Sequence, residues 1–206
     1  MKIVTIIGAR PQFIKAAVVS RAISSFPDIQ EVIVHTGQHF DTNMSDIFFE
    51  EMCIPKPNYN LNINGMTHGA MTGQMLEKIE SILLTEQPDW VIGDTNSTLA
   101  GALAASKLHI RVAHIEAGLR SYNMNMPEEI NRILTDRISS VLFCPTEQAI
   151  KNLHQEGFKQ FPCTLLNCGD VMQDAALFYA NKAKHPDFLL PEHFILATLH
   201  RAENTD

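Results

Sequence analysis

Long apolar runs are missing from this sequence of 206 residues. No run approaches the roughly 18 apolar residues of a membrane span. The short apolar run from Ile3 to Ile7 follows a single lysine and is too short for the apolar part of a secretory signal. We therefore expect a cytoplasmic protein that has no membrane partner.

Cysteines are few, and their spacing is not that of a metal site. Cys53, Cys144, Cys163 and Cys168 form no C-x-x-C pair and have no nearby histidines of the kind that hold zinc. The string from His114 to Glu116 is similar to the H-x-E motif of zinc deaminases, but the P-C-x-x-C that accompanies that motif is absent. We expect reduced, partly buried thiols and no metal.

Positive charge is also scarce. A formal net charge of -7 argues against general nucleic-acid binding, which needs a basic surface to replace the counterions around phosphates. The fingerprint G-x-G-x-x-G is absent, and the strand that ends before Thr36 lacks the acidic residue that would hold an NAD ribose. We therefore expect neither a nucleic-acid partner nor an NAD cofactor, and any anionic ligand must meet locally placed cations.

What the sequence does contain is an alternation of short apolar runs and helical stretches. The apolar runs are typical of buried strands and lie at Ile3 to Ile7, Val32 to His35, Trp90 to Ile92, Val112 to Ile115, Val141 to Phe143 and Thr164 to Leu166. Helical apolar spacing covers residues 12–25, 44–52, 67–86, 96–107, 128–138 and 146–156. This alternation predicts an α/β fold, a doubly wound parallel sheet of the Rossmann type. Helix starts are marked by proline or a capping residue at Pro11, Thr67, Pro127 and Thr146.

The last part of the sequence departs from this pattern. A helical stretch follows Gly169, then a polar, proline-bounded segment, and then a new strand from Phe194 to Thr198. An α/β domain normally places a loop and a helix after such a strand. We predict one domain over residues 1–170, with residues 171–206 as the first helix and strand of a second domain that a longer chain would complete.

Polar residues follow the strands expected in this sheet, at Arg10, Gln38, His39, Asp94, Glu116, His200 and Arg201. Ligands of an open parallel sheet bind beyond the carboxyl ends of its strands, so these side chains are expected to face one crevice. Arg10 and the free N–H groups of the helix it begins are candidates for binding a phosphate, with Lys15 about one turn further on. The alternative is an arginine and a lysine on a solvated helix face.

Three carboxylates are candidates for acid and base chemistry. Glu116 ends a strand and has no capping role to explain it, whereas Asp94 has an alternative role as an ordinary N-cap of the following helix. Glu128 and Glu129 both stand in the first helical turn after Pro127, where negative charge complements the helix dipole. For one of that pair the dipole role is a sufficient explanation.

Taken in order, several strings together resemble the non-hydrolysing UDP-N-acetylglucosamine 2-epimerases: GARPQFIK, HTGQHFD, GDTNSTLAGALAA, HIEAGLRS, MPEEINR, PTE and LHRAEN. The resemblance implies the GT-B architecture, in which two Rossmann-like domains enclose a UDP-sugar, and it implies a homodimer without a cofactor. It also implies a reaction that interconverts UDP-GlcNAc and UDP-ManNAc by eliminating UDP to give 2-acetamidoglucal and then adding it back.

The resemblance implies roles for the residues that match its motifs. Asp94, Glu116 and Glu128 match the acid and base positions, and His200 joins them near the leaving β-phosphate. The matching substrate-binding positions are Arg10, Lys15, Gln38, His39 and Arg201. In some family members the Gln38 loop binds an activating second substrate, but Gly73 stands where other members carry a basic residue.

Two alternatives to this reading stay open. Gln12 in GARPQFIK and the string GDVMQDA are closer to a branch that acts on UDP-2,3-diacetamido-2,3-dideoxyglucuronic acid. A GT-B glycosyltransferase would share the fold, but retaining transfer needs no proton abstraction at C2.

Overall fold

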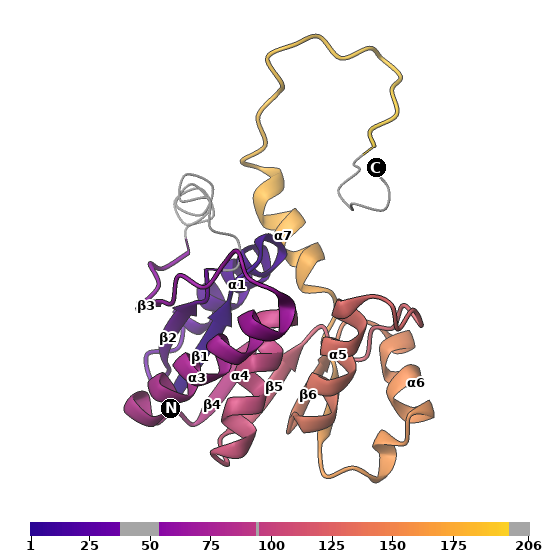
Figure 1. Ribbon diagram of the computed structural model, residues 1–206. Helices are drawn as coiled ribbons and strands as arrows, with labels where there is room; N and C mark the ends of the chain where they lie inside the picture. The colour runs from indigo at the N-terminus through magenta and orange to yellow at the C-terminus, as the bar shows by residue number, and fades with distance from the viewer. Residues whose placement is uncertain (38–53, 94, 198–206) are drawn as a thin grey trace.

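The computed structural model describes residues 1–37, 54–93 and 95–197, with Arg10, Thr95 and Asn96 described in their backbone only. Its centre is a parallel sheet in the order β3-β2-β1-β4-β5-β6-β7 (Figure 1). The strands are β1 (Lys2–Ile7), β2 (Gln30–His35), β3 (Tyr59–Asn60), β4 (Trp90–Gly93), β5 (Arg111–Ile115), β6 (Val141–Cys144) and β7 (Thr164–Asn167). The predicted doubly wound parallel sheet is confirmed, and the very short β3 is an addition to it.

Helices cover both faces of this sheet. They are α1 (Arg10–Ile23), α3 (His68–Glu86), α4 (Thr95–Lys107), α5 (Pro127–Ile138), α6 (Glu147–Gln155), α7 (Val171–Ala180) and the 3₁₀ turn η1 (Phe158–Gln160). Contacts join α3 to α4 and α4 to α5, while α1 packs against α7 (Figure 1). The helix predicted over residues 44–52 lies outside the described residues.

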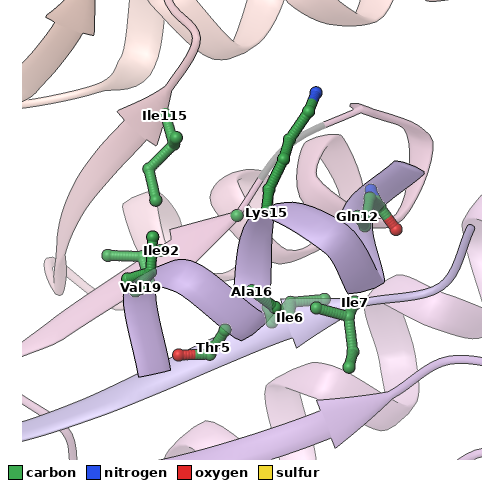
Figure 2. A pocket seen from close by; sticks show the side chains of 10 residues that line it. Thr5, Ile6, Ile7, Gln12, Lys15, Ala16, Val19, Ile92 and Ile115 are labelled. Carbon is green, nitrogen blue, oxygen red and sulfur yellow. The ribbon is translucent and has the colours of Figure 1, made fainter. Parts of the chain in front are cut away.

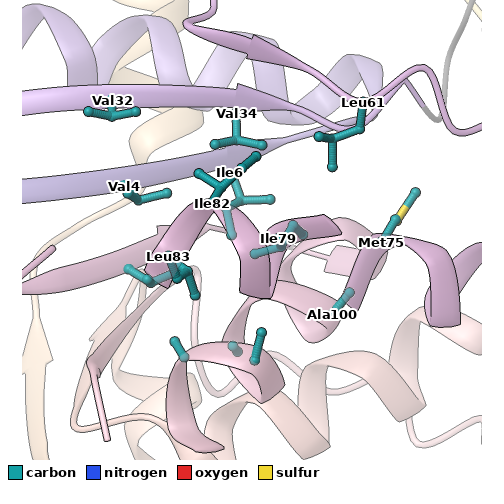
Figure 3. Close-up of a cluster of buried hydrophobic side chains, with 14 of the residues drawn as sticks. Val4, Ile6, Val32, Val34, Leu61, Met75, Ile79, Ile82, Leu83 and Ala100 are labelled. Carbon is teal, nitrogen blue, oxygen red and sulfur yellow. The ribbon is translucent and has the colours of Figure 1, made fainter. Parts of the chain in front are cut away.

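The alternation of side chains along β1 explains why both faces are apolar. Val4 and Ile6 belong to one core with Ile79 and Leu83 of α3, whereas Ile7 belongs to a second core with Phe13 of α1 (Figure 3). Successive residues of a strand point to opposite sides, so a strand that is buried on both faces is apolar throughout. The short apolar runs of the sequence therefore become the inner strands of the sheet.

The two threonines expected to cap helices behave differently. Thr146 accepts a hydrogen bond on its side chain from the backbone N–H of Ala149 at 3.1 Å, which satisfies one of the free donors of α6. Thr67 stands at the N-cap of α3 but makes no such bond.

This difference gives a matched pair of variants. We expect Thr146→Ala to lower the free energy of unfolding by about 1 kcal/mol, because a capping bond is lost. Thr67→Ala, the same chemical change without a capping bond to lose, should change it by less than about 0.5 kcal/mol. Urea unfolding followed by circular dichroism measures both, and equal effects would contradict the assignment of the cap.

The last described segment does not form the strand predicted at Phe194 to Thr198. Residues 194–197 have no strand structure, and the side chains of Ile195 and Leu196 are 96% and 82% exposed. Among the elements that the structure describes, no strand lies beside them (Figure 1), and a strand needs a partner for its hydrogen bonds. The helix α7 does form, and its Phe178 ring lies 3.4 Å from the guanidinium carbon of Arg21 on α1.

The described cysteines are free thiols in three different environments. Cys144 is buried, Cys163 is half-buried and Cys168 is exposed, so the expectation of partial burial is wrong for Cys168. Burial raises the pKa of the Cys144 thiol to about 12, and nearby Asp136 contributes to the rise. Within the described ranges, no helix combines the length and the apolar character that crossing a membrane requires.

Candidate functional site

The sheet order puts a topological switch point between β1 and β4. From these neighbouring strands the chain leads to α1 on one face and to α4 on the other. Helices that diverge in this way leave a ligand crevice beyond the carboxyl ends of the strands. β5 pairs with β4 so that His114 lies opposite Gly93. Residues that follow β1, β4 and β5 therefore share one edge of the sheet.

Lys15 and Glu116 form an ion pair at this edge. Lys15 Nζ lies 2.5 Å from Glu116 Oε2, and the two side chains are 10% and 15% exposed. Glu116 has a φ of 62°, a left-handed backbone that costs a residue with a Cβ about 1–2 kcal/mol. The fold thus brings together two of the predicted site residues that stand 101 positions apart in the sequence.

A small hollow that Lys15 helps to line lies between α1 and the strands β1, β4 and β5. Its walls are largely apolar and include Val19, Ile92 and Ile115. Figure 2 shows the Lys15 side chain rising from α1 beyond these apolar groups. Because apolar surroundings reduce the screening of charge, they strengthen the attraction between Lys15 and Glu116.

The side chain of Gln12 organises the loop that leads from β1 into α1. The Gln12 side-chain oxygen accepts the backbone N–H groups of Gly8 at 2.5 Å and Ala9 at 2.7 Å. The Gln12 N–H in turn donates to the Ala9 carbonyl, and Pro11 has no N–H group. Gln12 thus satisfies the N–H groups of Gly8 and Ala9 within the loop, and phosphate binding by Arg10 and the first turn of α1 stays a prediction.

The loop after β1 is packed too tightly for any side chain at Gly8. A Cβ at this position would lie 2.1 Å from both Thr36 Oγ1 and Ser97 Oγ. Those two hydroxyls are buried and hydrogen-bonded to each other at 2.9 Å. The ends of β1 and β2 and the start of α4 are thus held together at the switch point.

The two adjacent glutamates of α5 have separate roles. Glu129 is 1% exposed and accepts the backbone N–H groups of Ser121 and Tyr122 at 2.9 to 3.0 Å. Its carboxylate also lies 2.7 Å from Arg132 Nη1. Glu128 is exposed and, among the described residues, makes no hydrogen bond or ion pair with Lys15 or Glu116. Glu129 therefore has the structural role, and Glu128 is left available for a ligand.

Glu129 makes stability depend on pH in a defined direction. Burial raises its pKa, but the hydrogen bonds from Ser121 and Tyr122 and the charge of Arg132 outweigh burial and lower the pKa below the ordinary 4.5. A carboxyl whose pKa is lower in the folded state than in the unfolded state stabilises the fold. This stabilisation is complete at pH values above the unfolded-state pKa and is lost as the pH falls through the folded-state pKa. We expect Glu129→Gln to destabilise the protein by about 1–3 kcal/mol at neutral pH.

That difference should shrink as the pH falls below 4.5, which urea unfolding at a series of pH values measures. Glu128→Gln is the control one position earlier, and it should change the free energy of unfolding by less than about 1 kcal/mol. A Glu129→Gln deficit that stays constant on acidification would contradict this account.

A buried charge network under the Glu116 turn escaped the sequence analysis. Asp136 of α5 lies 2.6 Å from His114 Nδ1 and 2.8 Å from Arg120 Nη2, and Arg120 also binds Glu156 at 2.6 Å. Burial alone would lower the pKa of Arg120, but the hydrogen bonds and charges of Glu156 and Asp136 outweigh it and raise that pKa. The available signal was the spacing of Asp136, seven residues after Glu129 and hence on the same face of α5.

Several predicted residues lie outside what the structure describes. These are Asp94, Gln38, His39, His200, Arg201 and the side chain of Arg10. Gly73 is exposed on α3, with open space where a side chain would project. Across the described ranges, no group of three His, Cys, Asp or Glu side chains is arranged to hold a metal ion.

Comparison with known proteins connects this geometry to a family. A sequence profile described as UDP-N-acetylglucosamine 2-epimerase matches residues 21–206. UDP-2,3-diacetamido-2,3-dideoxy-D-glucuronate 2-epimerase of Pseudomonas aeruginosa is 66% identical over the whole chain, which covers 59% of that protein. UDP-N-acetylglucosamine 2-epimerase of Methanocaldococcus jannaschii is 49% identical over the whole chain, which covers 58% of it.

Solved structures agree with these matches. The crystal structure of the Methanocaldococcus jannaschii enzyme in complex with UDP-GlcNAc and UDP superposes with a TM-score of 0.85 at 51% identity, over 91% of this chain and 51% of that one. The Neisseria meningitidis enzyme bound to UDP-GlcNAc superposes with a TM-score of 0.81 at 34% identity, over 88% and 49% of the two chains. The chain thus spans little more than half the length of the relatives it matches. With most of its residues matched by the profile, the chain belongs to the UDP-N-acetylglucosamine 2-epimerase family.

Proposed function

We propose that this chain is the N-terminal part of an enzyme that inverts C2 of a UDP-linked 2-acetamido sugar. The observation that carries the proposal is the nearly buried ion pair of Lys15 and Glu116 at the switch point of the sheet. It supplies a carboxylate for proton transfer and a cation for a phosphate within one site. The family membership described above supports the same reaction.

In the proposed reaction, a base takes the proton from C2 while the C1–O bond breaks and UDP leaves with the bonding electrons. UDP then returns to C1 of the glycal as a proton is delivered to the other face of C2. Glu116 is proposed as one of the proton-transfer groups, with Glu128 and Asp94 as the other candidates. Lys15 pairs with Glu116 in the free protein and is proposed to turn toward the negative β-phosphate as UDP leaves.

The substrate we propose first is UDP-2,3-diacetamido-2,3-dideoxyglucuronic acid. The relative named for that substrate is 66% identical, whereas the Methanocaldococcus jannaschii relative named for UDP-N-acetylglucosamine is 49% identical. This reverses the order of the sequence analysis, in which UDP-GlcNAc came first and the diacetamido sugar was the alternative suggested by Gln12 and GDVMQDA. UDP-GlcNAc remains the second candidate, since a 56% identical relative is named a homolog of the enzyme for that sugar.

The remaining expectations are part of the same proposal. A second domain that begins near residue 171 would complete the UDP site and contain His200 and Arg201. Homodimer formation and a cytoplasmic location stay predictions. Analytical ultracentrifugation of the whole protein tests whether it is a dimer, and fractionation of cells tests where it is located.

Turnover of the whole enzyme in D₂O tests the proposed reaction. Each of the two UDP-sugars is supplied separately, and C2 of the recovered sugar is examined for deuterium by NMR. We expect deuterium at C2 and faster turnover of the diacetamido uronic acid. Sugar transfer to an acceptor without deuterium at C2 would instead identify a glycosyltransferase and overturn the proposal.

A further inference from the structure

We infer that Asp136 is a positioning residue for Glu116, because it holds the turn on both sides of Glu116 and so fixes the direction of its carboxylate. Asp136 lies on α5 and is fully buried, with 0% of its surface exposed. Among the residues that the structure describes, its contacts are with His114, Gly118 and Arg120 and not with a proposed substrate-binding residue. Its role rests on the proposed function, in which Glu116 transfers a proton.

The contacts of Asp136 bracket Glu116 in the sequence. Its Oδ1 is hydrogen-bonded to His114 Nδ1 at 2.6 Å, two residues before Glu116. Its Oδ2 accepts the backbone N–H of Gly118 at 3.2 Å, two residues after Glu116, and lies 2.8 Å from Nη2 of Arg120. One buried carboxylate therefore joins the strand that enters the turn to the segment that leaves it.

The turn needs such restraint because its backbone is unfavourable. Glu116 has a φ of 62°, which strains a residue with a Cβ, whereas Gly118 adopts its φ of 77° without that cost. Sparsely populated backbone conformations cost about 1–3 kcal/mol each and persist only where the surroundings over-determine them. A Cβ at position 118 would also lie 2.6 Å from the Ala149 carbonyl. The turn is therefore locked between α5 and α6 and cannot relax without loss of its contacts.

The charged groups around Asp136 strengthen its hold on the turn that carries Glu116. Arg120 lies between two carboxylates, those of Asp136 and Glu156, and its side chain is 1% exposed. Charge-assisted hydrogen bonds of this kind are shorter and stronger than neutral ones. With the turn held in this way, the Glu116 side chain reaches Lys15 across the edge of the sheet.

The same helix holds the far end of the loop. Glu129, in the first turn of α5, accepts the N–H groups of Ser121 and Tyr122. α5 therefore fixes the segment from His114 to Tyr122 at both ends, and the same helix carries Glu128. The turn that carries Glu116 is thus hydrogen-bonded to the helix that carries Glu128.

Asp136→Asn in the whole enzyme tests the positioning role, because the amide keeps the size of the carboxylate while it removes the charge and one acceptor. We expect kcat to fall about 10- to 100-fold with KM nearly unchanged, since a small misplacement of a reacting group costs up to about 10²-fold. In the Glu116→Gln background the same change should cost nothing further, because Asp136 acts through Glu116.

Ser139→Ala is the matched control at the end of α5. Ser139 is buried and donates a hydrogen bond to the Thr135 carbonyl at 2.7 Å, but it does not touch the turn, so kcat should be unchanged. A wild-type kcat in Asp136→Asn overturns the inference. So does a loss that recurs in the Glu116→Gln background, which is the mark of general destabilisation. If Asp136→Asn is not recovered folded, His114→Gln takes its place, because it removes one of the three partners of Asp136. Its kcat is then measured alone and in the Glu116→Gln background.

The wild-type enzyme is measured first, so that the two proposals fail separately. Absence of deuterium at C2 in the wild type refutes the proposed reaction. Deuterium in the wild type together with an unaffected Asp136→Asn kcat refutes only the positioning role.

Discussion

Replacing Glu116 by Gln in the whole enzyme is expected to lower kcat by about 10²- to 10⁴-fold, the usual contribution of a general acid or base. The amide has nearly the shape of the carboxylate, but it can neither accept nor return the proton of C2. Because Lys15 would still be present to bind the phosphate, KM should change much less than kcat. Steady-state kinetics and the rate of deuterium incorporation at C2 measure the two effects.

The matched control for this variant is Glu86→Gln. Glu86 is also paired with a lysine, Lys2, at 3.1 Å, and this pair lies at the opposite end of β1. The chemical change is the same, but it is remote from the crevice, so turnover should equal that of the wild type. A Glu116→Gln enzyme with wild-type kcat would remove Glu116 from the proposed mechanism and leave Glu128 and Asp94 as the candidates.

Replacing Arg120 by Met is expected to lower the free energy of unfolding by about 3–5 kcal/mol, because the change leaves the buried carboxylate of Asp136 without its cation. Arg120 lies 2.8 Å from Asp136 and 2.6 Å from Glu156, and its side chain is 1% exposed. Urea unfolding at neutral pH measures this loss directly.

Lys2→Met serves as the comparison for Arg120→Met. The Lys2–Glu86 pair is 31% and 18% exposed, and water screens such pairs, so the loss should stay below about 1 kcal/mol. Losses of similar size in the two variants would mean that the Arg120 network contributes little beyond an ordinary surface pair.

Most of the fold could be predicted from the sequence, because inner parallel strands are apolar on both faces and their helices begin at proline or threonine. β3 was missed because Tyr59–Asn60 has no apolar run. Residues 194–197 have no strand structure, and the strand expected at Phe194 to Thr198 stays a prediction for the second domain, because an apolar run forms a strand only where a partner exists.

The site was predicted less completely, for a physical reason. Glu116 and Lys15 could be identified singly, but their pairing depends on the sheet order and on the left-handed backbone at Glu116. Asp136 and Glu129 look like surface residues of an amphipathic helix until the loop that covers them is known. Glu128 and Glu129 are neighbours in the sequence, so the pattern of the helix could not decide which of them has the structural role. Their exposure decides it, because Glu129 is buried and Glu128 is exposed.

The left-handed backbone at Glu116 has a consequence for how this position tolerates change. Glycine adopts a φ of 62° without the strain that glutamate carries, so the residue most favourable for folding here is one with no carboxylate. Selection for abundance and selection for turnover therefore oppose each other at position 116. The glutamate at this position stands against the preference of its own backbone, and this conflict supports the proposal that its carboxylate takes part in the reaction.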